Sequence, residues 1–120
     1  MGYRSFRELR VWQEAKKLAV NIYKLTASGN LSKDFDLKDQ MQRAAVSVAS
    51  NIGEGYERKS NAEFIRFPYI SKGSLSERIT QLEIAKEVGL IPEDLFLNVG
   101  DQCNKVGAML TKLIQSRKSQ

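Results

Sequence analysis

Hydrophobic positions recur along the chain at the spacing of amphipathic helices, and four such segments can be traced. The first is predicted to begin near Ser5, where Ser5-Phe6-Arg7-Glu8 fits a capping box, and to run to about Ala27. Ser28-Gly29-Asn30 should end it, because glycine and asparagine tolerate the left-handed conformation that closes many helices. Its core stripe is expected to consist of Val11, Ala15, Leu18, Ile22 and Leu25.

The second and third segments have equally regular stripes. The second starts after Ser32 to Asp36 and places Leu37, Met41, Ala45, Val48 and Ile52 on one face. The third opens with the capping box Ser60-Asn61-Ala62-Glu63 and should stop at Gly89. Its stripe contains Phe64, Phe67, Ser71, Leu75 and Leu82.

The fourth helix is predicted to start at Ile91-Pro92-Glu93-Asp94. Proline suits the first helical position, and carboxylates favour the positive end of the helix dipole. Its stripe consists of Leu95, Val99, Val106, Leu110 and Leu113. No segment alternates convincingly with period two. We therefore expect an all-α protein, an antiparallel up-down-up-down four-helix bundle that forms a single domain over residues 1–120.

The second and third helices each carry an unusual second face. Small and lightly polar residues lie opposite the core stripe of the second helix, and apolar residues lie away from that of the third. Two buried faces are hard to place in a lone bundle, so we predict a subunit interface; the alternative is that small residues tighten packing within one chain. The candidate interface residues are Arg43, Ser47, Ala49, Ser50, Asn51, Glu54, Ile70, Gly73, Ser74, Glu77, Ile84 and Val88.

Charged members of such a buried strip need partners from another helix or subunit, because an unpaired buried charge is costly. Arg43 and Glu54 are about three turns apart on the second helix, too far to pair with each other. Glu77 on the third helix is the candidate partner of Arg43.

The amino-acid composition restricts the classes of function that the chain can have. A chain of 120 residues with 42% hydrophobic and 28% charged residues is sized for one folded core. It contains no histidine and one cysteine, Cys103, which is expected to be a core residue. No nucleophile, metal ligand set or phosphate-binding loop accompanies its carboxylates, so we expect no enzymatic activity, no cofactor and no metal. The N-terminal MGYRSFRELR lacks the apolar run of a secretory signal, and no stretch is long enough to span a membrane, which predicts a cytoplasmic protein.

A net charge of +5 is compatible with nucleic acid, although ordinary solubilising charge remains an alternative. Lysine and arginine without a base-reading geometry contact phosphates, which predicts weak sequence preference and strong salt dependence. An aromatic neighbour adds the option of base stacking. The candidate nucleic-acid-binding residues are Lys16, Lys17, Lys24, Tyr56, Arg58, Lys59, Arg117 and Lys118.

The stretch RAAVSVASNIGEGYERKSNAEFIRF, followed by KGSLSE and TQLEIA, resembles the four-helix bundle proteins of the 23S rRNA intervening-sequence family. FRELRVWQEAKKLAVNIYKLT is similar to the first helix of that bacterial family. The resemblance implies a ring-like homopentamer and gives no catalytic residues to carry over. A related group, the accessory variability determinant proteins of diversity-generating retroelements, binds nucleic acid and works with a reverse transcriptase.

Two functions from different classes follow. In the first, the assembled protein binds nucleic acid, with RNA favoured, and five copies of net charge +5 together carry +25. In the second, it is an oligomeric adaptor that binds a protein partner and has no direct role with nucleic acid. One residue departs from the family pattern: Pro68 falls inside the third helix, where it removes a backbone hydrogen bond, and we predict a kink near Phe64 to Pro68.

Overall fold

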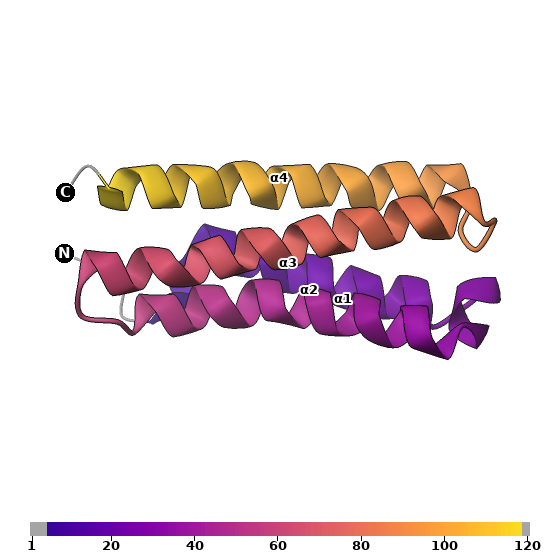
Figure 1. Ribbon diagram of the computed structural model, residues 1–120, viewed down its shortest axis with the longest axis horizontal. Helices are drawn as coiled ribbons and strands as arrows, with labels where there is room; N and C mark the ends of the chain where they lie inside the picture. Colours follow the sequence, from indigo (N-terminus) through magenta and orange to yellow (C-terminus); the bar gives the residue numbers. More distant parts are fainter. Residues whose placement is uncertain (1–4, 119–120) are drawn as a thin grey trace.

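The computed structural model describes residues 5–118 and consists of four α-helices and two short 3-10 helices (Figure 1). In chain order these are η1 (Phe6–Glu8), α1 (Arg10–Thr26), η2 (Asn30–Lys33), α2 (Phe35–Tyr56), α3 (Asn61–Glu87) and α4 (Glu93–Lys118). Successive α-helices run in opposite directions, and α1 packs against α4 to close the bundle. The all-α four-helix prediction is confirmed.

The core lies along the axis of a bundle that measures 46 × 20 × 19 Å. Most predicted stripe residues are buried there, among them Ala15, Leu18, Met41, Val48 and Leu110. The predicted helix ends are confirmed as well. Gly29 and Gly89 have φ values of 67° and 78°, in the left-handed region that glycine adopts without strain.

The predicted start of the first helix, near Ser5, is wrong: a separate 3-10 turn, η1, comes before α1. The Ser5 hydroxyl accepts a hydrogen bond from the Arg7 backbone N–H, and the Glu8 carboxylate accepts one from the Ser5 backbone N–H, so the capping box is present. However, this box caps only the 3-10 turn η1. Leu9 is extended, with φ −71° and ψ 126°, so α1 begins anew at Arg10. The break lets Phe6 fold back, edge-on to Trp12 with ring centroids 5.2 Å apart.

Helices α2 and α3 approach closely around Gly55. A Cβ atom on Gly55 would lie 2.8 Å from Cβ of Phe67 and 3.1 Å from the Phe64 carbonyl oxygen. Pro68 lies inside α3, well beyond its first turn, and it is buried against the same glycine. The absence of a side chain at Gly55 therefore lets α2 lie close to the turn of α3 that contains Pro68. The kink expected at this turn stays a prediction.

Small polar side chains continue this contact along the two helices. Ser71 Oγ donates to the Val48 carbonyl at 2.8 Å. One turn further, the hydroxyls of Ser47 and Ser74 are hydrogen-bonded at 2.9 Å. Asn51 donates to both the hydroxyl and the carbonyl of Ser47. Some of the small residues opposite the core stripe of α2 thus contribute to packing within one chain, which was the alternative to a subunit interface.

The largest fully buried side chain belongs to Arg78 on α3. Its Nη2 donates to the Met41 carbonyl, but Nε and Nη1 have no partner within the described chain. Burial lowers the pKa of Arg78 to about 10, with Cys103 and Glu77 opposing the shift. Burial likewise raises the pKa of the Cys103 thiol to about 11, which keeps this core cysteine protonated and unreactive at neutral pH.

Candidate nucleic-acid interface

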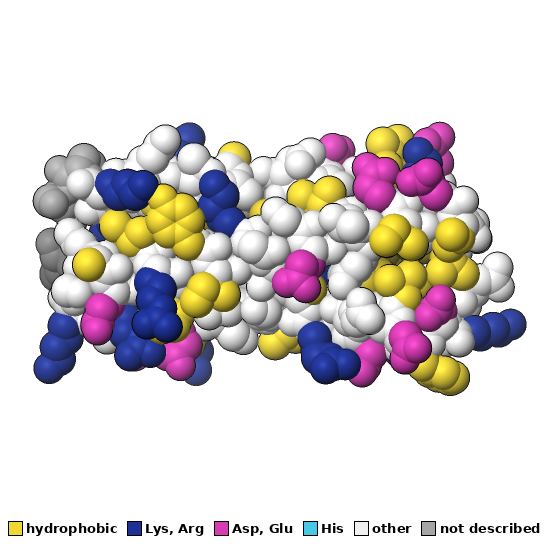
Figure 2. Space-filling model, in the orientation of Figure 1, with side chains coloured by type: hydrophobic (Ala, Val, Ile, Leu, Met, Phe, Trp, Pro, Cys, Tyr) yellow, Lys and Arg dark blue, Asp and Glu magenta, His cyan; other side chains and the backbone are white. Residues whose placement is uncertain are grey.

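Charge is distributed unevenly along the bundle. We divide the molecule near the middle of each helix into a basic half, residues 5–17, 47–73 and 106–118, and an acidic half, residues 18–46 and 74–105. The basic half holds 11 lysines and arginines against 5 acidic residues, and the acidic half holds 7 against 9. Figure 2 shows dark-blue side chains gathered toward the end that carries the start of α3, and magenta ones toward the other end.

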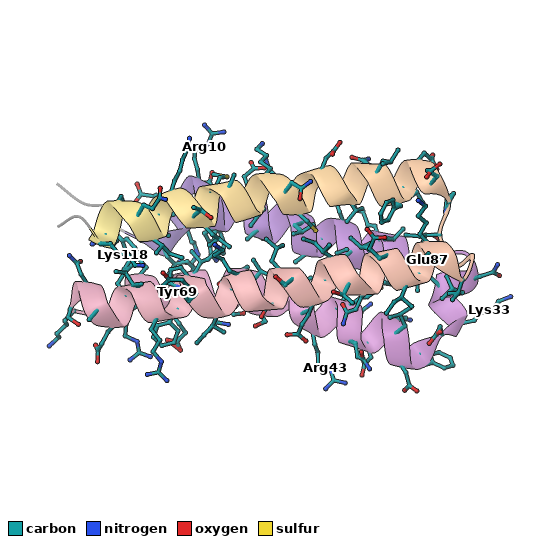
Figure 3. All side chains as sticks on the ribbon, turned by 45° about the horizontal axis from the view of Figure 1, so that its top comes forward. Arg10, Lys33, Arg43, Tyr69, Glu87 and Lys118 are labelled. Carbon is teal, nitrogen blue, oxygen red and sulfur yellow. The ribbon has the colours of Figure 1, made fainter. Side chains whose placement is uncertain are left out.

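Four cations of the basic half lie over the aromatic rings at the start of α3. The guanidinium of Arg117 is 4.0 Å from the centroid of Phe64, and that of Arg58 is 4.6 Å from the centroid of Phe67. Arg66 approaches the same Phe67 ring at 5.7 Å. Lys118 Nζ is 5.3 Å from the ring of Tyr69, and both residues lie at one end of the bundle in Figure 3.

The cluster forms because antiparallel connections bring three helix ends together. Arg58 follows the end of α2, Arg66 lies in the second turn of α3, and Arg117 belongs to the last turn of α4. Arg117 also donates to the Asn61 side chain at 3.3 Å, which fixes α4 against the start of α3. A guanidinium that rests on a ring still has N–H groups at its edge, and these are suited to phosphate oxygens.

The structure brings together some of the predicted binding residues and separates others. Arg58, Arg117 and Lys118 join the cluster, and exposed Lys59 adjoins Arg58 in the chain. Exposed Lys16 and Lys17 lie on α1, where Lys16 rests over Trp12 and Lys17 pairs with Glu14. Lys24 is exposed in the last turn of α1, in the acidic half.

Two cluster members were missed in the sequence, and one predicted residue has another role. Tyr56 is half-buried against the core, so its ring is largely occupied. Tyr69 instead has an exposed ring, at 46%, beside a cation. Arg66 was missed as well. The sequence signal for both was present, since aromatic and basic residues alternate after Glu63, but periodicity assigned only Phe64 and Phe67 to the core and gave Arg66 and Tyr69 no role.

Two of the three charged members of the predicted interface, Arg43 and Glu54, are paired within their own chain. Arg43 forms a salt bridge with Asp39 at 2.9 Å and projects away from the bundle in Figure 3. Glu54 pairs with Arg58 at 3.5 Å. The expected Arg43–Glu77 ion pair is therefore absent within residues 5–118, although both residues line one hollow between α2 and α3. The charges of Arg43 and Glu54 are not buried, because more than half of each side chain is exposed.

The outer face of α3 is the part of the predicted interface that stays uncovered. Ile70, Ile84 and Val88 are exposed there, as are Gly73 and Glu77. A Cβ atom on Gly73 would meet nothing within 4 Å, so no contact inside the chain explains a glycine in the middle of this helix. On α2, Ala49 and Ser50 line a separate groove of about 540 Å³ against Trp12 of α1.

Over residues 5–118, no group of three or more histidine, cysteine or acidic side chains is placed to hold a metal ion. None of the helices in that range is both long and apolar enough to cross a membrane.

The chain matches the family model of the 23S rRNA-intervening sequence protein over residues 7–112. Among solved structures, it is similar to a protein with unknown function from the S23 ribosomal protein family of Bacteroides thetaiotaomicron, determined by crystallography at 1.70 Å resolution. The TM-score is 0.80 at 24% sequence identity, and the match covers 87% of this chain and 97% of the other. At this identity the similarity shows a shared fold alone. No curated protein matches the chain.

Proposed function

The chain belongs to the 23S rRNA-intervening sequence protein family, and from its charge distribution we propose that it is a non-enzymatic, homo-oligomeric protein that binds RNA. The observation that carries the proposal is the cluster of Arg58, Arg66, Arg117 and Lys118 on the aromatic rings of α3. Cations held by a ring and a helix lose less conformational freedom on binding than free side chains do, so they are pre-organised for phosphates.

RNA is favoured over a specific duplex DNA sequence because the cluster consists of cations and aromatic rings, which contact phosphates and base faces and not base edges. Exposed Tyr69 beside Lys118 offers one stacking surface next to a phosphate contact, the combination used for single strands. Binding should therefore be strongly salt-dependent and only weakly sequence-dependent.

The test is an anisotropy titration of labelled single-stranded and structured RNA at several salt concentrations. Both RNAs should bind at low salt, with an affinity that falls steeply as salt rises, and Tyr69→Ala should weaken only the single-stranded complex. Protein purified at low salt should also carry RNA that absorbs at 260 nm and is lost at high salt. If neither RNA binds at low salt, the adaptor function with a protein partner replaces this proposal.

Assembly is proposed to use the exposed face of α3, and the number five rests on the family resemblance. Gly73 supports this, because a helix-interior glycine is about 1 kcal/mol worse than alanine, and no contact inside the chain compensates for that. Light scattering coupled to size exclusion should give about 68 kDa, five times the 13.6 kDa chain. Gly73→Trp should dissociate the assembly without unfolding the chain, and Gly73→Ala should weaken it by a smaller amount. A wild-type monomer at micromolar concentration would refute the interface.

A further inference from the structure

A groove of about 240 Å³ runs between α3 and α4 in the acidic half. Its floor is apolar, and two of its residues are unusually exposed, Ile79 at 38% and Leu97 at 56%. The lining residues are Ile79, Leu82 and Glu83 of α3 and Phe96, Leu97, Gly100, Asp101 and Asn104 of α4. In Figure 2 hydrophobic side chains gather on this part of the molecule, with acidic side chains around them.

The walls of this groove carry two carboxylates without a salt bridge, although Lys86 lies close enough to Glu83 to interact with its charge. Glu83 lies on the α3 wall and Asp101 on the α4 wall, and neither forms a salt bridge within residues 5–118. The nearby cation Lys86 is already paired with Glu93 at 3.0 Å and rests over Phe96 at 4.7 Å. An occupant of the groove therefore meets a carboxylate without a salt bridge on each side of an apolar floor.

Gly100 keeps the groove open. A Cβ atom added there would meet nothing within 4 Å, whereas one on Gly107, two turns further along α4, would lie 3.2 Å from Leu75. Gly107 thus has a packing role inside the chain, and Gly100 has none. A glycine in a helix interior is unfavourable by about 1 kcal/mol relative to alanine, so the absence of a side chain at position 100 matters only to something outside the chain.

We propose that this groove docks a cationic amphipathic helix of another protein. Apolar side chains of that helix would cover Ile79 and Leu97, and a lysine or arginine would lie between Glu83 and Asp101. Helices commonly bind in grooves between two helices through residues spaced three and four apart. The carboxylates repel phosphates, so nucleic acid is excluded from this site, and the proposal is independent of RNA binding in the basic half.

The probe is a labelled synthetic peptide of about 18 residues, five helical turns, with leucines at positions three and four apart and lysines beside them. Two control peptides accompany it: one with the same composition in scrambled order and one with glutamate in place of lysine. Anisotropy should show that the cationic amphipathic peptide binds at least about tenfold more tightly than either control. Equal binding of the scrambled peptide, or no binding of the first, would overturn the proposal.

Protein variants then locate the contact. Gly100→Trp should fill the groove and abolish binding, and Gly100→Ala should weaken binding by a smaller factor. Glu83→Lys/Asp101→Lys should reverse the preference toward the glutamate peptide, a gain that unfolding cannot produce. The matched charge control is Asp36→Lys/Asp39→Lys on α2 of the same half, which should retain the cationic preference. Binding that survives Gly100→Trp would show that the peptide attaches elsewhere and would reject the site.

A second copy of the chain is the competing occupant. Light scattering separates the two, because Gly100→Trp should leave the mass of the wild-type assembly unchanged. A fall in mass on that substitution would assign the groove to contact between copies and would overturn the proposal.

Discussion

The two halves of the bundle use the same elements in opposite ways. In the basic half, Gly55 is enclosed by Phe67 and Pro68, and cations lie over aromatic rings. In the acidic half, Gly100 faces an open groove whose carboxylates lack ion-pair partners within the described chain. The role of a glycine or a charged residue in these helices therefore depends on what the neighbouring helix places against it.

The difference extends to the arginines. Those around the start of α3 lie on aromatic rings at the surface, and their guanidinium edges are only partly used, by Glu54 for Arg58 and by Asn61 for Arg117. Arg78, in the acidic half, is fully buried with two unpartnered nitrogens. Exposed cations of the basic half are therefore available for binding, whereas Arg78 influences stability alone.

The largest expected effect follows from removing the positive charge of the basic half. Neutralising Arg58→Gln/Arg66→Gln/Arg117→Gln should weaken RNA binding about 100-fold at low salt and reduce the slope of log K against log salt by about 2, since each lost phosphate contact removes about 0.7. The matched variant Lys24→Gln/Lys33→Gln/Arg43→Gln removes the same charge from the acidic half and should change affinity less than about fivefold. Anisotropy titrations measure both.

Equal losses in the two variants would mean that net charge, and not the cluster, attracts the RNA. Thermal melts of both proteins must accompany the titrations, because Arg117 also donates to Asn61 and contributes to packing. Arg66→Gln alone is the cleanest single test, since Arg66 is exposed and rests on Phe67 of its own helix.

The next effect concerns the two glycines. Gly55→Ala should destabilise the fold by about 2 kcal/mol, because the new Cβ would lie 2.8 Å from Cβ of Phe67, and neither atom can swing away without moving a helix. Gly100→Ala should stabilise it by about 1 kcal/mol, through helix propensity with no steric conflict. Urea denaturation of both variants checks the prediction. Equal shifts of the same sign would remove the distinction between a closed and an open glycine.

Much of this fold was predictable because its helices are strongly periodic. Met41, Ala45, Val48 and Ile52 are all buried, as their spacing requires. The stops at Gly29 and Gly89 followed from local chemistry, because the left-handed conformation favours glycine. The Ser5 capping box was also correct, but capping satisfies amides in a 3-10 turn as well as in an α-helix, and so it did not reveal the break at Leu9.

The candidate sites were less predictable, because they depend on which helix covers which face. Periodicity places Arg78 between Leu75 and Leu82 on the core stripe, yet its charge argued against burial. Ser47 and Ser74 are 27 residues apart in sequence, and only the packing of α2 on α3 makes them partners. The basic cluster likewise joins residues from the ends of α2 and α4 with the start of α3, a set that no single helical pattern contains.

A smaller effect sharpens the contrast between exposed and buried arginines. Arg78→Met should stabilise the fold by about 1 kcal/mol at neutral pH, because it removes a buried charge with two unpartnered nitrogens and keeps the volume filled. Since the folded-state pKa of Arg78 is lowered to about 10, the unfolded chain holds this proton more tightly, and the wild type regains stability from this group above pH 10. The advantage of the variant should therefore shrink there. A destabilised variant at neutral pH would show that the guanidinium is satisfied.

The smallest effect tests the link between the halves. Glu14 of α1 pairs with Lys105 of α4 at 3.1 Å and with Lys17 at 3.4 Å. The Lys105 hydrogen bond lowers the pKa of Glu14, so its contribution is complete above the ordinary carboxyl value of 4.5 and is lost as the pH falls through the lowered one. Glu14→Gln should cost less than about 1 kcal/mol at pH 7, because ion pairs at the surface are screened by water. Thermal melts from pH 7 to pH 3 should show wild type and variant converging below pH 4.5, whereas a difference that stays constant would mean that Glu14 acts through packing and not through its charge.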